Sequence, residues 1–361
     1  MQRAARAVIN LTHLRHNYSI ARQYAGDSKV MCVVKADAYG HGMLEVADAL
    51  DEADGFAVAC VEEAIALRNH GVQQPITVFQ GFSSAEDLQL CSVNGLWPVV
   101  HHESQLRLLE DTPVSESLTV WLKITTGMNR LGFVTDEVHS VWKKLNGLVS
   151  IRSIKLMTHM ACADEDSPED EESKTAKQIR LFESASSGID AERSLANSAT
   201  LINWPQARQQ WVRPGIMLYG GAPFLPDYGP NLNLKPVMTL TSSVVAVNYR
   251  RAGDRVGYGA TWHCPQDMNI ATVSIGYGDG YPRGITQGTP ILINGMRANI
   301  VGRVSMDLLT VDVSGMDVSV GDQAVLWGEG LSVNDIAAKA NTISYELFCN
   351  VSKHVEKVFI R

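Results

Sequence analysis

The chain has 361 residues, which is long for one average domain and comfortable for two. Apolar residues make up 45% and charged residues 19%, so we expect a packed core rather than disorder. The net charge of −8 argues against a nucleic-acid-binding surface. No apolar run approaches the ~20 residues of a membrane span, and no apolar signal core follows the basic N-terminus, so we expect a cytoplasmic protein. The six cysteines stand singly, which indicates free thiols and speaks against a zinc site or other metal centre.

The first two thirds of the chain alternate between helical and strand patterns. Residues 11–24 show helical spacing, with Asn10 or Thr12 as the possible cap. Short apolar strands are predicted after it, at 29–35, 55–60, 75–80, 96–101, 118–124, 151–158, 193–197 and 216–219. Helices fill the gaps, for example at 61–69 and 86–91. Strands that are apolar throughout are expected where a parallel sheet is buried on both faces, and eight such units favour an α/β fold of the (β/α)8 TIM-barrel type. A doubly wound open sheet is the alternative.

The pattern changes after a proline- and asparagine-rich segment at 223–230. Helical spacing almost disappears until 333–340, and turns such as Asn294-Gly295 separate alternating apolar and polar runs. These runs lie at 236–248, 269–275, 290–294, 298–303, 308–313 and 323–327. They predict a C-terminal, mainly antiparallel β domain. We place the boundary near residue 232, with a barrel over 1–232 and the β domain over 233–361.

The stretch 164–172 carries seven acids and one proline. A cation site is one interpretation. However, Ser167-Pro168-Glu169-Asp170 is typical of a cap, a first-turn proline and acids at the start of a helix. We therefore expect a solvated loop that leads into a helix.

A lysine stands at the end of the first predicted barrel strand. The apolar run 30–34 leads into Lys35, a turn of small residues follows, and a helical pattern covers 43–50. Desolvation lowers the pKa of a lysine from its usual ~10.4, and the neutral amine can form an imine with an aldehyde. An ordinary solvent-facing lysine is the alternative.

Polar residues end several other predicted barrel strands. Arg130 follows the fifth strand, His159 the sixth and Ser198 the seventh. The carboxyl ends of barrel strands share one face, which carries the active sites of this fold. Arg213 begins the eighth strand as predicted here, and it joins this face only if that strand starts earlier. One Arg or His at a strand end is usually a salt-bridge partner, but four or five such residues on one face indicate a site.

Part of this set could hold a phosphate. Ser198, the backbone N–H groups of Gly215 and Ile216, and the hydroxyl of Tyr39 lie where barrels often bind phosphate, near the last strands. Lys35 could hold an aldehyde. The combination suits pyridoxal 5′-phosphate, which acts as an electron sink for carbanions.

The sequence resembles the alanine racemases, a family of pyridoxal-phosphate isomerases built from a barrel followed by a β domain. The resemblance covers essentially the whole chain and rests on motifs in the right order, at 33–42, 126–132, 213–216, 257–260, 275–281, 302–307 and 344–346. It implies interconversion of L-alanine and D-alanine, with D-alanine supplied to peptidoglycan. A racemase of the same fold with a broader range, taking serine or basic amino acids, is the alternative.

The resemblance also implies the catalytic roles. Lys35 would hold the cofactor and move the α-proton on the D side, and Tyr258 would take the α-proton from the L enantiomer. His159 and then Arg213 would be linked to Tyr258 and polarise it. Arg213 would face the pyridine nitrogen, and it gives that atom no proton because guanidinium stays protonated. In the family this tyrosine reaches the cofactor of the partner subunit, which implies a head-to-tail homodimer with composite sites.

The remaining implied roles concern binding. Arg130 would bind the cofactor's phenolic oxygen and the substrate carboxylate. The phosphate would be held by Tyr39, Ser198, Gly215, Ile216 and Tyr345. Tyr277, Tyr345 and Met306 would shape a narrow entrance and contact the substrate. Lys123 matches a lysine that is carbamylated in many family members, and an unmodified strand-end lysine is the alternative.

Overall fold

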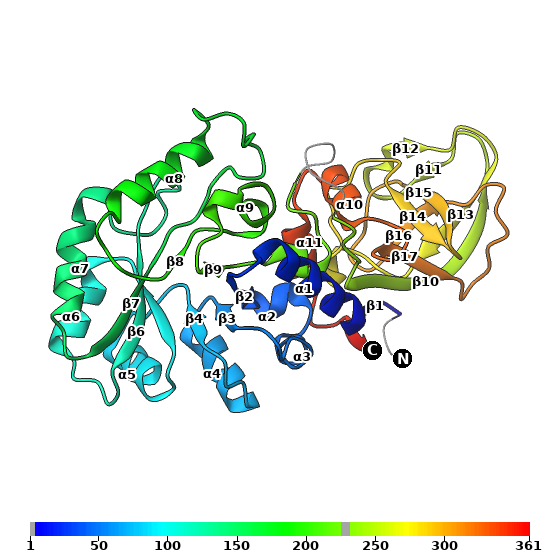
Figure 1. Ribbon diagram of the computed structural model, residues 1–361. Helices are drawn as coiled ribbons and strands as arrows, with labels where there is room; N and C mark the ends of the chain where they lie inside the picture. Colours follow the sequence, from blue (N-terminus) through cyan, green and yellow to red (C-terminus); the bar gives the residue numbers. More distant parts are fainter. Residues whose placement is uncertain (1–3, 225–231) are drawn as a thin grey trace.

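The computed structural model describes residues 4–224 and 232–361. These residues form a parallel barrel and a second, mainly antiparallel sheet, on the left and right of Figure 1. The predicted fold class is confirmed. The predicted boundary at residue 232 stays a prediction, and residues 225–231, most of the linker invoked for it, lie outside the described residues.

The barrel closes because its last strand pairs with its first, with Lys29 opposite Trp211. Its parallel strands are β2 (Lys29–Val33), β3 (Gly55–Val58), β4 (Ile76–Val78), β5 (Trp97–Val100), β6 (Leu118–Lys123), β7 (Ile151–Met157), β8 (Arg193–Ser194) and β9 (Trp211–Val212). The first seven fall within the predicted ranges. The eighth prediction is wrong, because residues 216–219 form the short 3-10 helix η3 (Ile216–Tyr219) and the strand is β9. An apolar run of four residues does not distinguish a strand from a buried helical turn.

Helices follow most of the barrel strands (Figure 1). The helix α1 (Leu11–Ala25) precedes the first barrel strand. Those that follow barrel strands are α2 (Lys35–Gly40), α3 (Met43–Ala49), α4 (Val61–His70), α5 (Ala85–Val93), α6 (Glu103–Asp111), α7 (Val138–Asn146), α8 (Lys174–Ala185) and α9 (Ser198–Asn203). Asn10 rather than Thr12 caps α1, since its side chain accepts the backbone N–H of His13 at 3.0 Å.

The helix start predicted at Ser167 is wrong. The cap of α8 is Ser173, whose hydroxyl accepts the backbone N–H of Ala176 at 3.2 Å. The acidic stretch before it is a loop, as expected. Asp166 folds this loop onto the helix, because its carboxylate accepts the backbone N–H and the hydroxyl of Thr175, each at 2.7 Å. The hydrogen bonds from Thr175 to Asp166 therefore fix the start of α8, and Pro168, which had suggested an earlier start, lies in the loop.

The second sheet has the strand order β13-β16-β15-β14-β17-β10-β1-β18. Its strands are β10 (Met238–Arg250), β13 (Met268–Val273), β14 (Pro290–Ile293), β15 (Met296–Val301), β16 (Leu309–Asp312), β17 (Gln323–Trp327), β1 (Arg6–Asn10) and β18 (Glu356–Ile360). The first strand of the chain thus belongs to this sheet: β1 pairs antiparallel with β10 and parallel with β18. A small ribbon of β11 (Arg255–Val256) and β12 (Trp262–His263) lies beside it.

Two helices near the C-terminus, α10 (Val333–Lys339) and α11 (Ser344–Cys349), bring the end of the chain to the barrel. In Figure 1 they lie between the barrel and the second sheet. α11 packs on α2, and Gly40 allows the close approach, because a Cβ at this position would overlap the backbone carbonyl of Phe348. One continuous hydrophobic cluster runs from the barrel into the second sheet. Among the described residues, no helix has the length and apolar character that a membrane crossing requires.

Candidate active site

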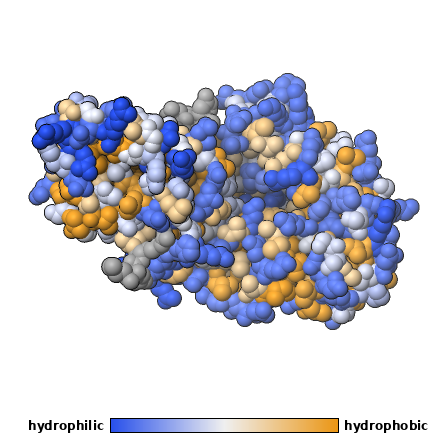
Figure 2. Space-filling view, turned by 180° about the vertical axis from the view of Figure 1, so that it is seen from behind, coloured by the Kyte–Doolittle hydropathy of each residue, from blue (hydrophilic) through white to orange (hydrophobic). Residues whose placement is uncertain are grey.

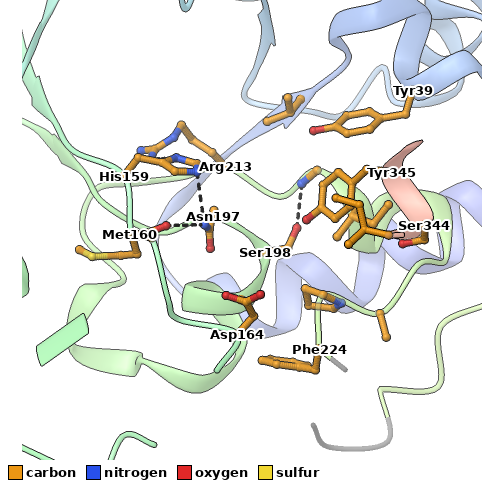
Figure 3. A pocket seen from close by; sticks show the side chains of 18 of the residues that line it. Tyr39, His159, Met160, Asp164, Asn197, Ser198, Arg213, Phe224, Ser344 and Tyr345 are labelled. Carbon is orange, nitrogen blue, oxygen red and sulfur yellow. Dashed lines mark hydrogen bonds between the residues drawn. The ribbon is translucent and has the colours of Figure 1, made fainter. Parts of the chain in front are cut away.

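A cavity of about 480 Å³ opens at the carboxyl end of the barrel strands, against α10 and α11 (Figure 3). Nine of the residues predicted from the sequence line it: Lys35, Tyr39, Arg130, His159, Ser198, Arg213, Gly215, Ile216 and Tyr345. Arg213 lies at this face because it directly follows β9, which ends at Val212. The eighth strand thus starts before Arg213, as the placement of this residue on the face required. The wall away from the barrel includes Ala337 of α10 and Ser344 of α11.

Lys35 begins α2, which is an unusual element. Residues Ala36 to Tyr39 have φ between 52° and 54°, so this turn is left-handed. Left-handed helical residues other than glycine each cost roughly 1–2 kcal/mol, and such a turn persists only where other contacts hold it. Glu63 accepts the backbone N–H of Ala36 at 2.7 Å, and Asp37 accepts that of Met43 at 2.8 Å. The turn fixes where Lys35 and Tyr39 point.

The environment of Lys35 favours its neutral amine. Burial and, after it, the nearby Arg130 guanidinium lower the pKa of Lys35. Nζ lies 5.9 Å from the centroid of the Phe79 ring, a contact that favours the ammonium and is outweighed by burial and Arg130. A larger neutral fraction makes this amine a better nucleophile towards a carbonyl carbon.

Arg213 is buried at the cavity wall and is held by the ends of neighbouring strands. Its Nη1 donates to the hydroxyl of Ser194, and its Nη2 donates to the carbonyls of Thr158 at 2.7 Å and Leu195 at 3.2 Å. Burial lowers the pKa of Arg213 to about 10, so it stays charged at neutral pH. Its Nη2 lies 3.5 Å from Nδ1 of His159. Burial, and then this guanidinium, keep the pKa of His159 well below its usual range.

Four basic side chains act on one another at this end of the barrel. Lys123 is the last residue of β6, close to the cavity but not in its lining. Burial, and then Arg213, Arg130 and Lys35, lower the pKa of Lys123 to about 8. Such an arrangement creates a positive potential, which an anionic ligand would relieve.

A polar cradle lies on the opposite side of the cavity from His159 (Figure 3). The backbone N–H of Gly215 donates to the hydroxyl of Ser198 at 2.9 Å. The ring of Tyr39 packs between Tyr219, at 4.9 Å between centroids, and Tyr345, at 5.7 Å. A Cβ on Gly215 would lie 2.7 Å from the Tyr39 hydroxyl oxygen, so the close approach requires glycine.

Family comparisons agree with this architecture over both parts of the chain. The family "Alanine racemase, N-terminal domain" matches residues 9–223, and "Alanine racemase, C-terminal domain" matches residues 237–359. The chain belongs to the alanine racemase family.

Individual alanine racemases are similar over nearly the full length. "Alanine racemase, catabolic" from Pseudomonas putida is 45% identical to this chain, and the alignment covers 97% of this chain and 98% of the relative's length. The alanine racemase of Coxiella burnetii is 44% identical, covering 99% of each chain. The crystal structure of the biosynthetic alanine racemase from Pseudomonas aeruginosa superposes with a TM-score of 0.95 at 39% identity, covering 100% of both chains. The structure of the alanine racemase from Acinetobacter baumannii has a TM-score of 0.93 at 38% identity, covering 99% of this chain and 100% of that chain.

Three residues to which the alanine racemase resemblance gave roles lie away from this cavity. Tyr258, Tyr277 and Met306 are on loops of the second sheet and are 69%, 40% and 56% exposed. These loops form one surface: the N–H of Tyr277 donates to the carbonyl of Ser305 at 3.1 Å, and that of Gly278 to the carbonyl of Met306 at 2.8 Å. The loop of Tyr258 lies against that of Met306, since a Cβ on Gly257 would be 3.1 Å from the backbone nitrogen of Arg303.

Several polar residues that line the cavity were not predicted from the sequence, among them Asp164 and Asn197. Asp164 was assigned to a solvated loop, yet it lines the cavity, and burial raises its pKa. Asn197 directly precedes Ser198, and its Nδ2 lies 3.5 Å from Nε2 of His159. Its position before a helix was a signal for a cap, and nothing in the sequence pattern placed its amide beside His159.

Proposed function

We propose that this protein interconverts L-alanine and D-alanine, with pyridoxal 5′-phosphate bound in the barrel cavity. The observation that carries the proposal is that Lys35, Arg213 and Ser198 line one cavity in a chain of this family. They bring together a nucleophilic amine, a permanent cation and a hydroxyl beside free space for a small charged ligand.

The residues present fit the cofactor. The glycine at 215 leaves the space beside Tyr39 that a side chain would fill, and the donors around it suit a phosphate. We assign the phosphate to Tyr39, Ser198, Gly215, Ile216 and Tyr345. Arg213 would face the ring nitrogen and Lys35 the aldehyde. When bound, pyridoxal phosphate supplies an electron sink for the charge left by a departing α-proton.

Lys35 supplies one of two acid–base groups. Its lowered pKa favours the neutral amine, which can bond to the aldehyde carbon and, once released, take up or return a proton at Nζ. Arg130, exposed at the rim and acting on Lys35 through its charge, would orient the substrate carboxylate near that atom. We assign Lys35 to the proton on the D side.

The second acid–base group would come from another subunit. Inverting the α-carbon needs proton transfer on two faces, and one amine lies on one face. Tyr258 is exposed on a surface that also carries Tyr277 and Met306. We propose that this surface covers the cavity of a partner in a head-to-tail homodimer, with Tyr258 of the partner subunit on the L side. Figure 2 shows hydrophobic residues gathered at the lower edge of the β domain, on the left, whereas the β11–β12 ribbon that flanks Tyr258 lies at the upper edge of this domain in Figure 1, so this patch is separate from the surface that carries Tyr258.

Lys123 would orient the cationic groups after a modification. A pKa near 8 leaves an appreciable neutral fraction at neutral pH. The neutral amine adds to carbon dioxide and loses one proton, which gives a carbamate. That anion would offset the charges of Arg130 and Arg213, which act on this lysine.

The decisive assay measures loss of optical rotation for a set of L-amino acids with pyridoxal phosphate supplied. We expect racemisation of alanine well above that of serine, lysine or arginine. Equal rates on the larger substrates would favour the broad-range racemase, and no racemisation of any would contradict the proposal. Borohydride reduction of the cofactor-loaded protein should attach the cofactor to Lys35, and labelling of another lysine would remove its assigned role.

Composite sites are tested by mixing two inactive variants. In a heterodimer of Lys35→Ala and Tyr258→Phe, one of the two sites would keep both groups. Random reassociation should therefore restore roughly a quarter of wild-type activity, because half of the dimers are heterodimers with one intact site. No recovery after confirmed subunit exchange would mean that each site uses its own tyrosine.

A further inference from the structure

The side-chain amide of Asn197 is held in one orientation (Figure 3). Its Oδ1 caps α9 by accepting the backbone N–H of Thr200 at 3.0 Å and the Thr200 hydroxyl at 2.9 Å. Nδ2 therefore points the other way, 3.3 Å from the carbonyl oxygen of Met160 and 3.5 Å from Nε2 of His159. An amide nitrogen carries two hydrogens, one for each of these partners.

A second donor faces the other nitrogen of the same ring. Nη2 of Arg213 is 3.5 Å from Nδ1 of His159, and a guanidinium has no acceptor. Both ring nitrogens of His159 thus face N–H groups. A neutral imidazole still offers a lone pair to one of them. An imidazolium offers none and directs an N–H at a donor on both sides.

We propose that Asn197 is a positioning residue that, together with Arg213, prevents the imidazole of His159 from taking up a second proton. Arg213 supplies a positive charge and a donor beside Nδ1, whereas Asn197 supplies the donor beside Nε2. The cap on α9 gives the amide its direction, since Oδ1 is already used by Thr200.

The charged groups around the ring act in the same direction. Those that lower the pKa of His159, after burial, come from four strand ends or loops: Arg213 after β9, Lys123 at the end of β6, Arg130 in the loop after β6, and Lys35 after β2. Asp164, in the loop after β7, also lines the cavity, but no hydrogen bond joins it to His159 among the described residues. These charges act on the whole ring, whereas the N–H of Asn197 opposes protonation at one atom, Nε2.

The consequence for the reaction rests on the proposed function. A ring that cannot gain a second proton cannot remove the proton of a phenol that Tyr258 of the partner subunit brings beside it. The proton taken from L-alanine then stays on the phenol and is available for return. Asn197 would thereby ensure that the phenol of Tyr258 of the partner subunit, and not His159, both takes and returns the proton on the L side.

The substitution Asn197→Asp tests this inference. An aspartate keeps one oxygen on Thr200, so the cap of α9 remains, and its other oxygen replaces the donor beside Nε2 with a charged acceptor. A carboxylate at this distance raises the pKa of a protonated partner by about 1–3 pH units. We expect the titration midpoint of His159 to rise by that amount, measured by NMR of the full-length protein with carbon-13-labelled histidine rings. His159→Gln assigns the signal.

Thr200→Val is the matched control, because it removes the hydroxyl bond to Oδ1 and leaves Nδ2 in place. It should not move the His159 midpoint. An unmoved midpoint in Asn197→Asp, or an equal rise in Thr200→Val, would overturn the inference. The wild-type protein gives an independent measurement if the variant does not fold: a His159 midpoint near the ordinary value of ~6.5 would also overturn it.

A kinetic arm separates this inference from the proposed function. In Asn197→Asp we expect the acid limb of kcat/KM for alanine to move to higher pH, while KM changes little. If the wild-type protein does not racemise alanine, the proposed function fails, but the ring titration still decides the role of Asn197. If the titration moves and the pH profile does not, the protonation state of His159 has no bearing on catalysis, and the role in keeping the proton on the phenol is refuted.

Discussion

Gly215→Ala is the substitution whose effect on cofactor binding follows most directly from the structure. An ordinary van der Waals contact of a Cβ begins at about 3.4 Å, and the new Cβ would lie 2.7 Å from the Tyr39 hydroxyl oxygen. Tyr39 cannot easily retreat, because it is buried between Tyr219 and Tyr345 and belongs to the left-handed turn. Overpacking of this kind typically costs about 1–3 kcal/mol.

If the added methyl destabilises the cofactor-bound protein by this amount relative to the cofactor-free protein, the affinity for pyridoxal phosphate falls about 5- to 150-fold, because 1.4 kcal/mol is about tenfold in Kd. The assay is a titration of the cofactor-free protein with pyridoxal phosphate, followed by absorbance. Gly284→Ala is the matched control, because Gly284 is exposed and its Cβ would meet nothing within 4 Å. A Kd for Gly215→Ala within twofold of that of the control would refute the assignment of the cradle.

A double-mutant cycle identifies the atom responsible. In a Tyr39→Phe background the oxygen that the new methyl meets is absent, so Gly215→Ala should cost much less there than in the wild type. Equal costs in both backgrounds would show that the substitution acts elsewhere. Thermal unfolding without cofactor separates a loss of binding from a loss of fold stability.

The other predictions concern the acid–base groups and Lys123. Lys35→Ala should abolish racemisation and borohydride labelling, and undiminished turnover would refute its role. Tyr258→Phe should slow solvent-deuterium exchange into L-alanine more than into D-alanine; equal losses would count against two separate bases. With a Lys123 pKa of about 8, the carbamate signal formed from carbon-13 bicarbonate should weaken as pH falls from 8 to 6 and be absent in Lys123→Ala. A signal that is independent of pH or persists in that variant would contradict the modification.

The arrangement of the barrel follows from local sequence patterns, with one error. Buried parallel strands give short apolar runs, and seven of the eight strands lie where such runs stand. The strand β9 has two residues, Trp211–Val212, too few for any periodicity, and the longer apolar run after it drew the prediction to 216–219. The strands β1 and β18 were not predicted from the sequence. They lie at opposite ends of the chain and pair with each other, and local patterns do not reveal such a pairing.

The site could be predicted where a residue's position depends on strand direction alone. That is why Lys35, His159 and Ser198 reach one cavity. The left-handed turn that aims Lys35 contains Ala36 to Tyr39 and no glycine until Gly40, so no composition signal marks it. Asn197 shows a further limit: the cap is predictable from its residue type, but His159, the other group beside its amide, comes from the loop after β7 and depends on the closed barrel.

The position of Tyr258 leads to a final prediction about concentration. In water a phenol ionises near pH ~10, so it is a weak base at neutral pH, and a nearby cation stabilises its anion. The cations that could do so line the barrel cavity, whereas Tyr258 is 69% exposed on the far sheet of the same chain. The tyrosine would therefore become an effective base only where a second chain brings it to that cavity. Specific activity should fall on dilution below the dimer dissociation constant, in step with the dimer fraction from light scattering. Activity that stays constant while the protein becomes monomeric would show that a group within one chain supplies the second base.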